Sequence, residues 1–522
     1  MYHIKVLASL DDRIDAEFYN PEALRTIQRM EDVGEVVTLG SLIQEGYRVV
    51  YHGTDSINGL KQDQLLPFLS PTQIDKDGAI SFEIADQLPK YYKDEYPKGL
   101  AKEGELLVEV KGNVSKVAVV PSVFPKNLMV SGSLYKASIN QNKADTHYVL
   151  AFLKSASGQV LKDRLTSNTI INYIAKDALY SIPVFKIAMP AQKYIGEKVR
   201  QAERLRAWAK DLQRQIKQQF EFLVKQKPAA SKYSWTSSFD LEPYRINPGH
   251  YDPVVLSLLK RANGEGLKLE PISALLGNRK IAGGATPKGA DYLESGVLFG
   301  RVQNVKPLAL DLSDAVFIDA DTNEQLSRSE CQVDDIVLSI TGYPGTASLV
   351  TEQDLPMNIN QHSVRFNVGK GVDSAYVCAA LNSEFLKLQV QRLSIGGTRD
   401  ALDFPSVGNL LIPRLSEDIE SAVAVSVRHY IKAVQFSKLL TFVAKTLVEE
   451  LIEGNISEAE LVFAQQALEA GDDSLDRALL ERMTAEGIDA DSETLFDDID
   501  QLYDLLDQAK QALDAGNSMA EA

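Results

Sequence analysis

Two long stretches of the chain carry apolar residues at alternating spacings of four and three. The first lies within residues 187–228 and has no glycine or proline between Gly196 and Pro228. The second covers residues 417–455 and keeps the spacing more regularly. Because this spacing places apolar side chains along one side of a helix, each stretch predicts a long helix with a coiled-coil seam. A helix of about 37 residues is on the order of 55 Å long.

Short apolar runs bounded by turns predict strands, and several of them recur about 230 residues later. Residues 104–112 and 334–342 each show an acidic turn, a buried strand and a glycine loop, at a shift of 230. A helical pattern at residues 148–155 recurs at residues 376–383, at a shift of 228. Elements in the same order at a nearly constant shift indicate an internal duplication.

The duplication and the two long helical stretches together predict an α+β protein of several parts. We expect two tandem domains on two antiparallel helices, with approximate two-fold symmetry, and a small helical C-terminal module. The predicted parts are a first domain (1–186), a first long helix (187–228), a second domain (229–416), a second long helix (417–455) and a tail (456–522).

The formal net charge of −17, from 55 basic and 72 acidic residues, at first argues against nucleic acid. The charge is uneven, however. Residues 453–522 hold 19 acidic and 3 basic residues, a net charge of −16, so the rest of the 522-residue chain is nearly neutral. The acidity therefore belongs to the tail, and a DNA-binding role for the body stays open.

Other features narrow the possible classes of protein. No apolar run reaches the 18 or so residues of a membrane span, and the first residues lack the pattern of a signal peptide, so we expect a cytoplasmic protein that does not bind membranes. Only Cys331 and Cys378 are present, and no CxxC or HExxH motif occurs. We therefore expect reduced, buried thiols and no local zinc site.

Several motifs of the two halves resemble the specificity (S) subunits of type I restriction-modification systems. An Arg-Ile-Asp/Asn-x-x-x-Tyr-x-Pro signature opens each half, at residues 13–21 and 245–253. A Gly-Gly-x-Thr-Pro stretch at residues 283–287 precedes the apolar run 296–302. Together with the strand and glycine loop and the Ile-Pro before each long helix, these motifs extend the resemblance over about residues 10–455.

The resemblance implies a non-catalytic subunit that recognises DNA. In that family each half supplies a target recognition domain and a long helix, the helices pair antiparallel, and each domain reads one half of a split site. The implied partners are double-stranded DNA, two methyltransferase (modification) subunits and a restriction/translocase subunit. The partners would carry out adenine methylation and restriction. No cofactor is expected on this chain, since S-adenosylmethionine, Mg²⁺ and ATP belong to the partner subunits.

The geometry of a split site follows from the helix length. A spacer of about 55 Å corresponds to roughly 16 base pairs of duplex at 3.4 Å each, before tilt and curvature shorten it. The first half lacks the Gly-Gly-x-Thr-Pro stretch and has residues 46–54 in its place. Since domains that read different sequences diverge at their reading loops, we expect the two half-sites to differ.

Polar and basic residues gather in the loops that could enter a DNA groove. Base edges are read by Arg, Lys, Asn, Gln, Ser and Thr, and phosphates by Lys, Arg and backbone N–H groups. The predicted DNA-contacting residues in the first half are Lys111, Asn113, Lys116, Asn168 and Thr169. Those in the second half are Arg301, Gln303, Asn304, Thr341, Tyr343, Asn360, Gln361, His362, Arg365, Thr398 and Arg399.

Two enzymatic alternatives arise from the sequence. Glu109 and Lys111 on a buried strand, with Asp94 upstream, match the way metal-dependent nucleases place ligands and a lysine. The repeat argues against this reading, because the equivalent residues are Ser339 and Thr341. Residues 19–22 also echo a methyltransferase motif, but its second proline and aromatic residue are missing and no glycine-rich loop accompanies it.

A different class of protein is also open. The coiled coil and the acidic tail could form a protein-interaction scaffold whose domains no longer read DNA. The tail itself could be a solvated appendage, a partner-docking module or a mimic of DNA that covers the basic groove.

Overall fold

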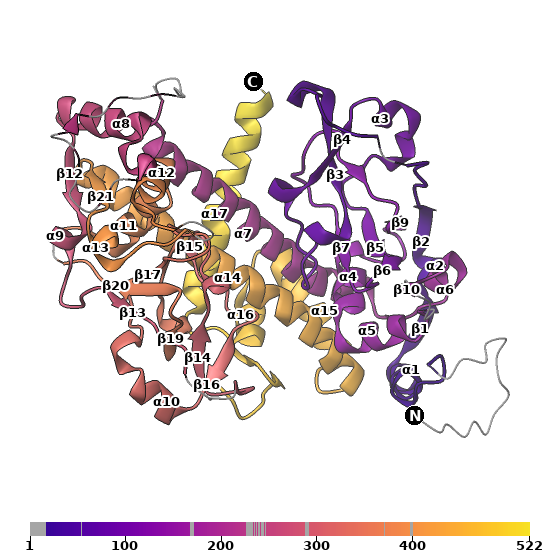
Figure 1. Ribbon diagram of the computed structural model, residues 1–522. Coiled ribbons are helices and arrows are strands. Elements are labelled where there is room, and N and C mark those ends of the chain that lie inside the picture. Colours follow the sequence, from indigo (N-terminus) through magenta and orange to yellow (C-terminus); the bar gives the residue numbers. More distant parts are fainter. Residues whose placement is uncertain are drawn as a thin grey trace. The chain divides into compact units, whose positions relative to one another are not determined.

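The computed structural model describes residues 17–521 apart from 54, 167–171, 226–232, 234, 236, 239–240, 242–244, 246, 288–291, 370 and 397–399. Figure 1 shows the chain coloured along its sequence. The chain divides into two compact units. Unit 1 comprises Met1–Ala207 and Val434–Ala522, and unit 2 comprises Trp208–Ala433.

Unit 1 contains two main sheets. A four-stranded antiparallel sheet has the order β2 (Ile43–Tyr47), β9 (Leu134–Ile139), β5 (Leu106–Glu109) and β7 (Val117–Val119), and a three-stranded sheet has the order β4 (Asp86–Pro89), β3 (Leu65–Leu69) and β8 (Met129–Val130). Two further pairs join β1 (Glu35–Thr38) to β11 (Pro183–Lys186) and β6 (Lys111–Gly112) to β10 (Asn172–Tyr173). The helices are α1 (Pro21–Val33), α2 (Leu39–Leu42), α3 (Tyr92–Glu95), α4 (Thr146–Lys154), α5 (Ala156–Asp163) and α6 (Lys176–Tyr180).

Unit 2 is built from a similar set of elements. A five-stranded sheet has the order β13 (Ala282–Gly283), β20 (Ser363–Phe366), β17 (Ile336–Ser339), β18 (Ala347–Leu349) and β15 (Leu308–Ala309). A three-stranded sheet joins β16 (Val316–Ile318), β14 (Val297–Gly300) and β19 (Met357–Ile359), and β12 (Lys268–Pro271) pairs with β21 (Leu411–Arg414). The helices are α8 (Pro253–Gly264), α9 (Ile272–Leu275), α10 (Ala320–Gln325), α11 (Ser374–Leu381), α12 (Glu384–Leu393) and α13 (Phe404–Gly408).

The two units repeat one sheet topology, and the fold class is α+β. The order β2-β9-β5-β7 in unit 1 corresponds to β13-β20-β17-β18 in unit 2, and β4-β3-β8 corresponds to β16-β14-β19. In both three-stranded sheets one pair is parallel, β3 with β8 and β14 with β19. The central strands β5 and β17 are buried at all four positions, which explains their continuous apolar runs. Helix α4 packs against β7, and α11 packs against β18.

The two long helices are α7 (Met189–Glu221) and α14 (Glu417–Glu453). Each is shared between the units, which differs from the predicted separation of helices from domains. The reason is that their apolar residues also pack on the domain cores. In unit 2, Phe220 of α7 has its ring 5.9 Å from that of Tyr376 on α11. Val423 and Val427 of α14 belong to the same core.

A short helix of each unit is fixed by the same contacts to a long helix and to the strand that precedes that long helix. In unit 1 the N-cap carboxylate of Asp145 pairs with Arg200 of α7 at 2.9 Å, and the hydroxyl of Tyr148 donates to the carbonyl of Phe185. In unit 2 these contacts are Asp373 with Arg428 at 3.0 Å, and Tyr376 with Pro413. Each residue of the first set lies 228 positions before its equivalent, so the duplicated sequence builds a duplicated joint.

The tail folds into α15 (Glu458–Glu469), α16 (Ser474–Glu481), β22 (Met483–Thr484), β23 (Gly487–Ile488) and α17 (Ile499–Glu521). Asp476 of α16 and Lys198 of α7 are both fully buried, with the Lys198 Nζ 2.5 Å from Oδ1 of Asp476. The hydroxyls of Tyr194 and Tyr503 donate to the same carboxylate. The tail is therefore part of the unit 1 core, and the interpretation as a solvated appendage is wrong.

The expectation for the cysteines is confirmed, because Cys331 and Cys378 are both free and buried. Burial raises the pKa of both thiols well above the ordinary value. Among the described residues, no helix combines the length and apolar character needed to cross a bilayer.

The buried pair in the tail leads to a stability prediction. Lys198→Met leaves a buried carboxylate without its cation, so we expect the free energy of unfolding to fall by about 3–5 kcal/mol. Replacing both groups, in Lys198→Met with Asp476→Leu, should recover most of that loss. Lys193→Met serves as control, because the half-exposed pair of Lys193 with Glu469 contributes only about 0–1 kcal/mol. Urea unfolding, with hydrogen exchange of the α16 amides, measures these changes.

The same pair makes the tail sensitive to acid. Burial alone would raise the pKa of Asp476, but Lys198 and the tyrosine hydroxyls outweigh it and lower the pKa. A lowered pKa gives stability that is complete above the unfolded value of about 3.9 and disappears as pH falls through the folded value. Unfolding at several pH values below 5 should show this loss in the wild-type chain. Asp476→Asn should remove that part of the pH dependence, and an unchanged acid profile would contradict it.

Candidate nucleic-acid interface

The glycine loop of unit 1, residues 110–116, is shaped by one buried carboxylate. Glu109 ends β5 and is only 4% exposed. Its Oε1 accepts from the backbone N–H of Asn113 at 3.2 Å, and its Oε2 accepts from the N–H groups of Ser115 and Lys116 at 3.0 and 3.1 Å. Both carboxylate oxygens are therefore occupied by the loop backbone.

The equivalent loop of unit 2, residues 340–346, is held in the same way by a neutral group. Ser339 Oγ accepts from the N–H of Thr346 at 3.0 Å and donates to the carbonyl of Tyr343 at 2.8 Å. The backbone N–H of Ser339 also donates to the carbonyl of Thr346, just as the N–H of Glu109 donates to the carbonyl of Lys116. Position 109/339 is thus a loop-shaping position in both units.

This geometry argues against the hypothesis of a metal-dependent nuclease. Glu109 uses its oxygens structurally, and Asp94 lies on α3 beside the other sheet of unit 1. Over the described part of the chain, no group of three or more His, Cys, Asp or Glu side chains could hold a metal ion.

Unit 1 gathers cations on the face next to its glycine loop. Exposed Lys111 lies opposite Tyr173 in the β6–β10 pair. The guanidinium of Arg48 lies over the Tyr173 ring, 5.6 Å from its centroid. The ammonium of Lys176 lies 5.0 Å from the Tyr180 ring. No carboxylate within the described chain forms an ion pair with these three cations, which leaves them available to an anion.

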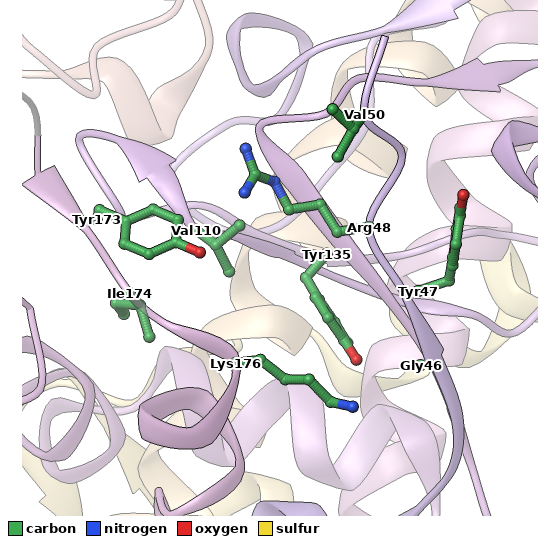
Figure 2. Close-up of a pocket in the computed structure, with 9 residues that line it drawn as sticks. All are labelled: Gly46, Tyr47, Arg48, Val50, Val110, Tyr135, Tyr173, Ile174 and Lys176. Atoms are coloured by element: carbon green, nitrogen blue, oxygen red, sulfur yellow. The ribbon is translucent and has the colours of Figure 1, made fainter.

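A pocket of about 330 Å³ opens on this face. Figure 2 shows the side chains that line it. Arg48 reaches it from the end of β2, and Lys176 from the first turn of α6. Aromatic and aliphatic side chains form the rest of the wall. The lining residues are Gly46, Tyr47, Arg48, Val50, Val110, Tyr135, Tyr173, Ile174 and Lys176. The pocket therefore combines ring surfaces with two positive charges.

One further cation borders this pocket. Lys98 is exposed, and its ammonium lies 5.2 Å from the centroid of the Tyr47 ring. We call Arg48, Lys98, Lys111 and Lys176 the basic face of unit 1. Alternating cations and aromatic rings are typical of surfaces that bind the nucleic-acid backbone and its bases.

The corresponding face of unit 2 is polar and mostly uncharged. Hydrogen bonds link Thr286 to Gln361, Gln361 to His362, and His362 to Thr341. These residues come from three loops that are far apart in sequence. Tyr343, at the tip of the glycine loop, is 89% exposed. The structure therefore brings four predicted residues of unit 2 together and adds Thr286 to them.

Other predicted residues of unit 2 are used inside the domain. Asn304 is fully buried and bonds the main chain of Arg301 and the carboxylate of Asp314. Arg365 is 7% exposed and donates to two backbone carbonyls, those of Lys280 and Arg328. These placements argue against a direct DNA contact for Asn304 and Arg365, because both side chains are buried and bond groups inside the domain.

The remaining predicted residues fall into three groups. Arg301 and Gln303 both donate to Asp314, and Asn360 is 8% exposed and accepts from the N–H of His362. Asn113 is exposed and Lys116 half-buried on the unit 1 loop. Asn168, Thr169, Thr398 and Arg399 lie outside the described residues.

Sequence reasoning missed Arg48, Lys98, Tyr173 and Lys176. They come from three separate segments, so no local motif joins them. The only available signal was the adjacency of aromatic and basic residues at Tyr47-Arg48 and again from Tyr173 to Lys176. The pairing of β6 with β10, which no local sequence pattern shows, brings Lys111 and Tyr173 together.

Comparison with known proteins gives distant structural similarities. The chain is similar to crystallised S subunits. One is the type I restriction-modification S subunit from M. genitalium, at 14% identity over 83% of this chain and 95% of that chain, with a TM-score of 0.37. Another is the HsdS subunit from Thermoanaerobacter tengcongensis, at 12% identity over 81% and 97%, with a TM-score of 0.27. No protein-family model matches the chain, and no curated protein matches it.

The role of Glu109 can be tested through stability. Glu109→Ala removes the buried acceptor of three backbone N–H groups of the glycine loop, so we expect the free energy of unfolding to fall by about 2–3 kcal/mol. Glu103→Ala is the control, because Glu103 is exposed in the preceding turn and should change stability by about 0.5 kcal/mol or less. Urea unfolding with and without Mg²⁺ measures both effects. If Mg²⁺ stabilises the wild type and Glu109→Ala abolishes this stabilisation, the nuclease hypothesis is supported again.

Proposed function

We propose that this chain is the DNA-recognition subunit of a type I restriction-modification complex. Each unit would read one half of a split target in double-stranded DNA. Partner subunits would carry out adenine methylation and restriction, and S-adenosylmethionine, Mg²⁺ and ATP would bind there. Two modification subunits and one restriction/translocase subunit are the expected partners.

The observation that carries this proposal is the repetition of one fold with two different loop faces. The order of the sheets recurs, as do the loop-shaping position 109/339, at a shift of 230, and the joint to the long helix, at a shift of 228. The exposed loop residues do not recur: unit 1 presents cations, and unit 2 presents Thr286, Gln361 and Tyr343. Two domains that recognise different targets are expected to share one scaffold and to differ in the polar loops that the scaffold carries.

The long helices support the split target. In the proposal, α7 and α14 pair antiparallel and act as a spacer between the two recognition domains. At about 1.5 Å per residue, the 33 residues of α7 span about 50 Å, which is roughly 15 base pairs of duplex. Helices of this length also offer surface to modification subunits.

The charge distribution bears on how tightly the chain binds alone. The body is almost neutral, and the basic face of unit 1 has only four cations. Phosphate contacts dominate the affinity of DNA-binding proteins and make it depend on salt. The isolated chain should therefore bind DNA weakly, with partner subunits adding phosphate contacts.

Two experiments test whether the chain reads a split site. Selection from random duplex DNA with the full-length chain should enrich a motif of two half-sites separated by a gap. Mapping of methylated adenines in cells with and without the gene should give the same split motif, present only with the gene. A methylome that does not change would instead favour the protein-interaction scaffold.

The basic face predicts a particular dependence on salt. Lys111→Gln and Arg48→Gln should each weaken binding to any duplex and make the slope of log K against log salt shallower by about 0.9. Lys143→Gln is the charge-matched control, because the Lys143 ammonium already bonds the carbonyl of Ser41 on another part of unit 1. Fluorescence anisotropy between 50 and 200 mM salt measures the slopes. Equal slopes for Lys111→Gln and the wild type would exclude this face.

A further inference from the structure

The pocket of unit 1 has a counterpart position in unit 2, which the sheet registers identify. Tyr47 of β2 pairs with Lys136 of β9, and Ala282 of β13 pairs with Arg365 of β20. Since Lys136 and Arg365 are equivalent in the two sheets, the next residues, Arg48 and Gly283, are also equivalent.

A second equivalence comes from the opposite wall of the pocket. The N–H of Ile174 donates to the carbonyl of Val110, and the N–H of Leu402 donates to that of Ile340. Two residues further on, Lys176 begins α6 and Phe404 begins α13. Lys176 and Phe404 therefore occupy the same place in the two units.

In unit 2 this place is filled. The ring of Phe404 lies so close to Gly283 that a Cβ atom on Gly283 would be 2.6 Å from the Phe404 Cζ. A residue with a side chain at position 283 would clash there. In unit 2, therefore, the glycine and the phenylalanine fill the space that is open between Arg48 and Lys176 in unit 1.

The open pocket has a definite chemical character. Its volume of about 330 Å³ is at the lower end of the range for small-molecule sites. Apolar and aromatic groups dominate its wall, and Arg48 and Lys176 add two charges. The Nε of Arg48 donates to the carbonyl of Gly132 at 2.6 Å, which fixes the side chain. A flat apolar ring beside an anionic group, as in a nucleotide, matches this arrangement.

The pocket lies on the face where the proposed function places DNA. Lys111, which stands opposite Tyr173 in the β6–β10 pair, joins the pocket to the glycine loop. A pocket of this size excludes a duplex but admits one nucleotide. Proteins that place a single DNA base in such a pocket first draw it out of the stack and then hold it by stacking and hydrogen bonds.

We propose that this pocket takes one nucleotide of the DNA target, with its base out of the duplex stack. The base lies against the Tyr173 ring, and its phosphate binds Arg48 and Lys176. This inference rests on the proposed function and adds an asymmetry to it. Unit 1 unstacks one base of its half-site, whereas unit 2, with the space filled by Phe404, reads its half-site with the bases stacked.

Base unstacking can be measured with the full-length chain and the duplex that it selects. The fluorescent base 2-aminopurine is placed in turn at each position of both half-sites. A several-fold rise in fluorescence on binding is expected at one position of one half-site. Lys176→Phe, which places a ring at the position of Phe404 in unit 2, should abolish the rise. Lys111→Gln should weaken binding but keep the rise at saturating protein.

A second variant and a second probe check the result of the fluorescence experiment. Arg48→Gln removes the phosphate contact without filling the pocket and should reduce the rise, even if Lys176→Phe folds poorly. Free deoxynucleoside monophosphates are titrated in parallel. Binding of the free nucleotides that depends on Lys176, without a fluorescence rise in the duplex, would overturn the assignment to a DNA base.

The remaining outcomes separate the inference from the proposed function. If the wild-type chain selects a split motif but no position shows a rise, or if Lys176→Phe keeps the rise, the pocket inference is wrong and the proposed function stands. If the wild-type chain selects no motif and the methylome does not depend on the gene, both are wrong.

Discussion

The joint between each domain and its long helix is the contact on which the rest of the structure depends. In unit 1, Asp145 accepts from the first N–H groups of α4 and pairs with Arg200 of α7. In unit 2, Asp373 does the same for α11 and Arg428. One carboxylate thus caps a domain helix and anchors a long helix. Because α4 and α11 pack on the sheets that carry the glycine loops, this joint sets where each loop lies relative to its own helix.

The tail breaks the equivalence of the two halves. Tyr194 and Lys198 of α7, which bind Asp476, correspond at the 228-residue shift to Ala422 and Ser426 of α14. Ala422 is exposed, and no lysine stands beside it to compensate a buried carboxylate. The tail can therefore bury Asp476 only on α7, since a buried charge needs a partner. Much of the acidic character of the chain is thus attached to the core of unit 1 and not to a free extension.

The two faces use charge differently. On unit 1, Arg48, Lys111 and Lys176 have no carboxylate partner in the described chain, so their charge is directed to solvent. On unit 2, Arg301 is bonded to Asp314, and Arg365 to backbone carbonyls. Polar groups such as Gln361 and His362 remain for contact. In the proposed function, unit 1 would contribute more to phosphate binding and unit 2 more to the reading of base edges.

The sequence by itself determined the elements that depend on local order. It predicted the duplication, the strand and glycine loop at 104–112 and 334–342, the two long helices and the short helices of the acidic tail, since periodicity and turns are properties of neighbouring residues. The repeat also argued against Glu109 as a metal ligand, because the equivalent residue is Ser339. Only the tertiary structure decided that Asn304 and Arg365 are buried, that Asp476 finds Lys198, and that Arg48, Tyr173 and Lys176 form one pocket. These contacts join residues from distant segments, and their pairing depends on strand register and burial, which no local pattern specifies.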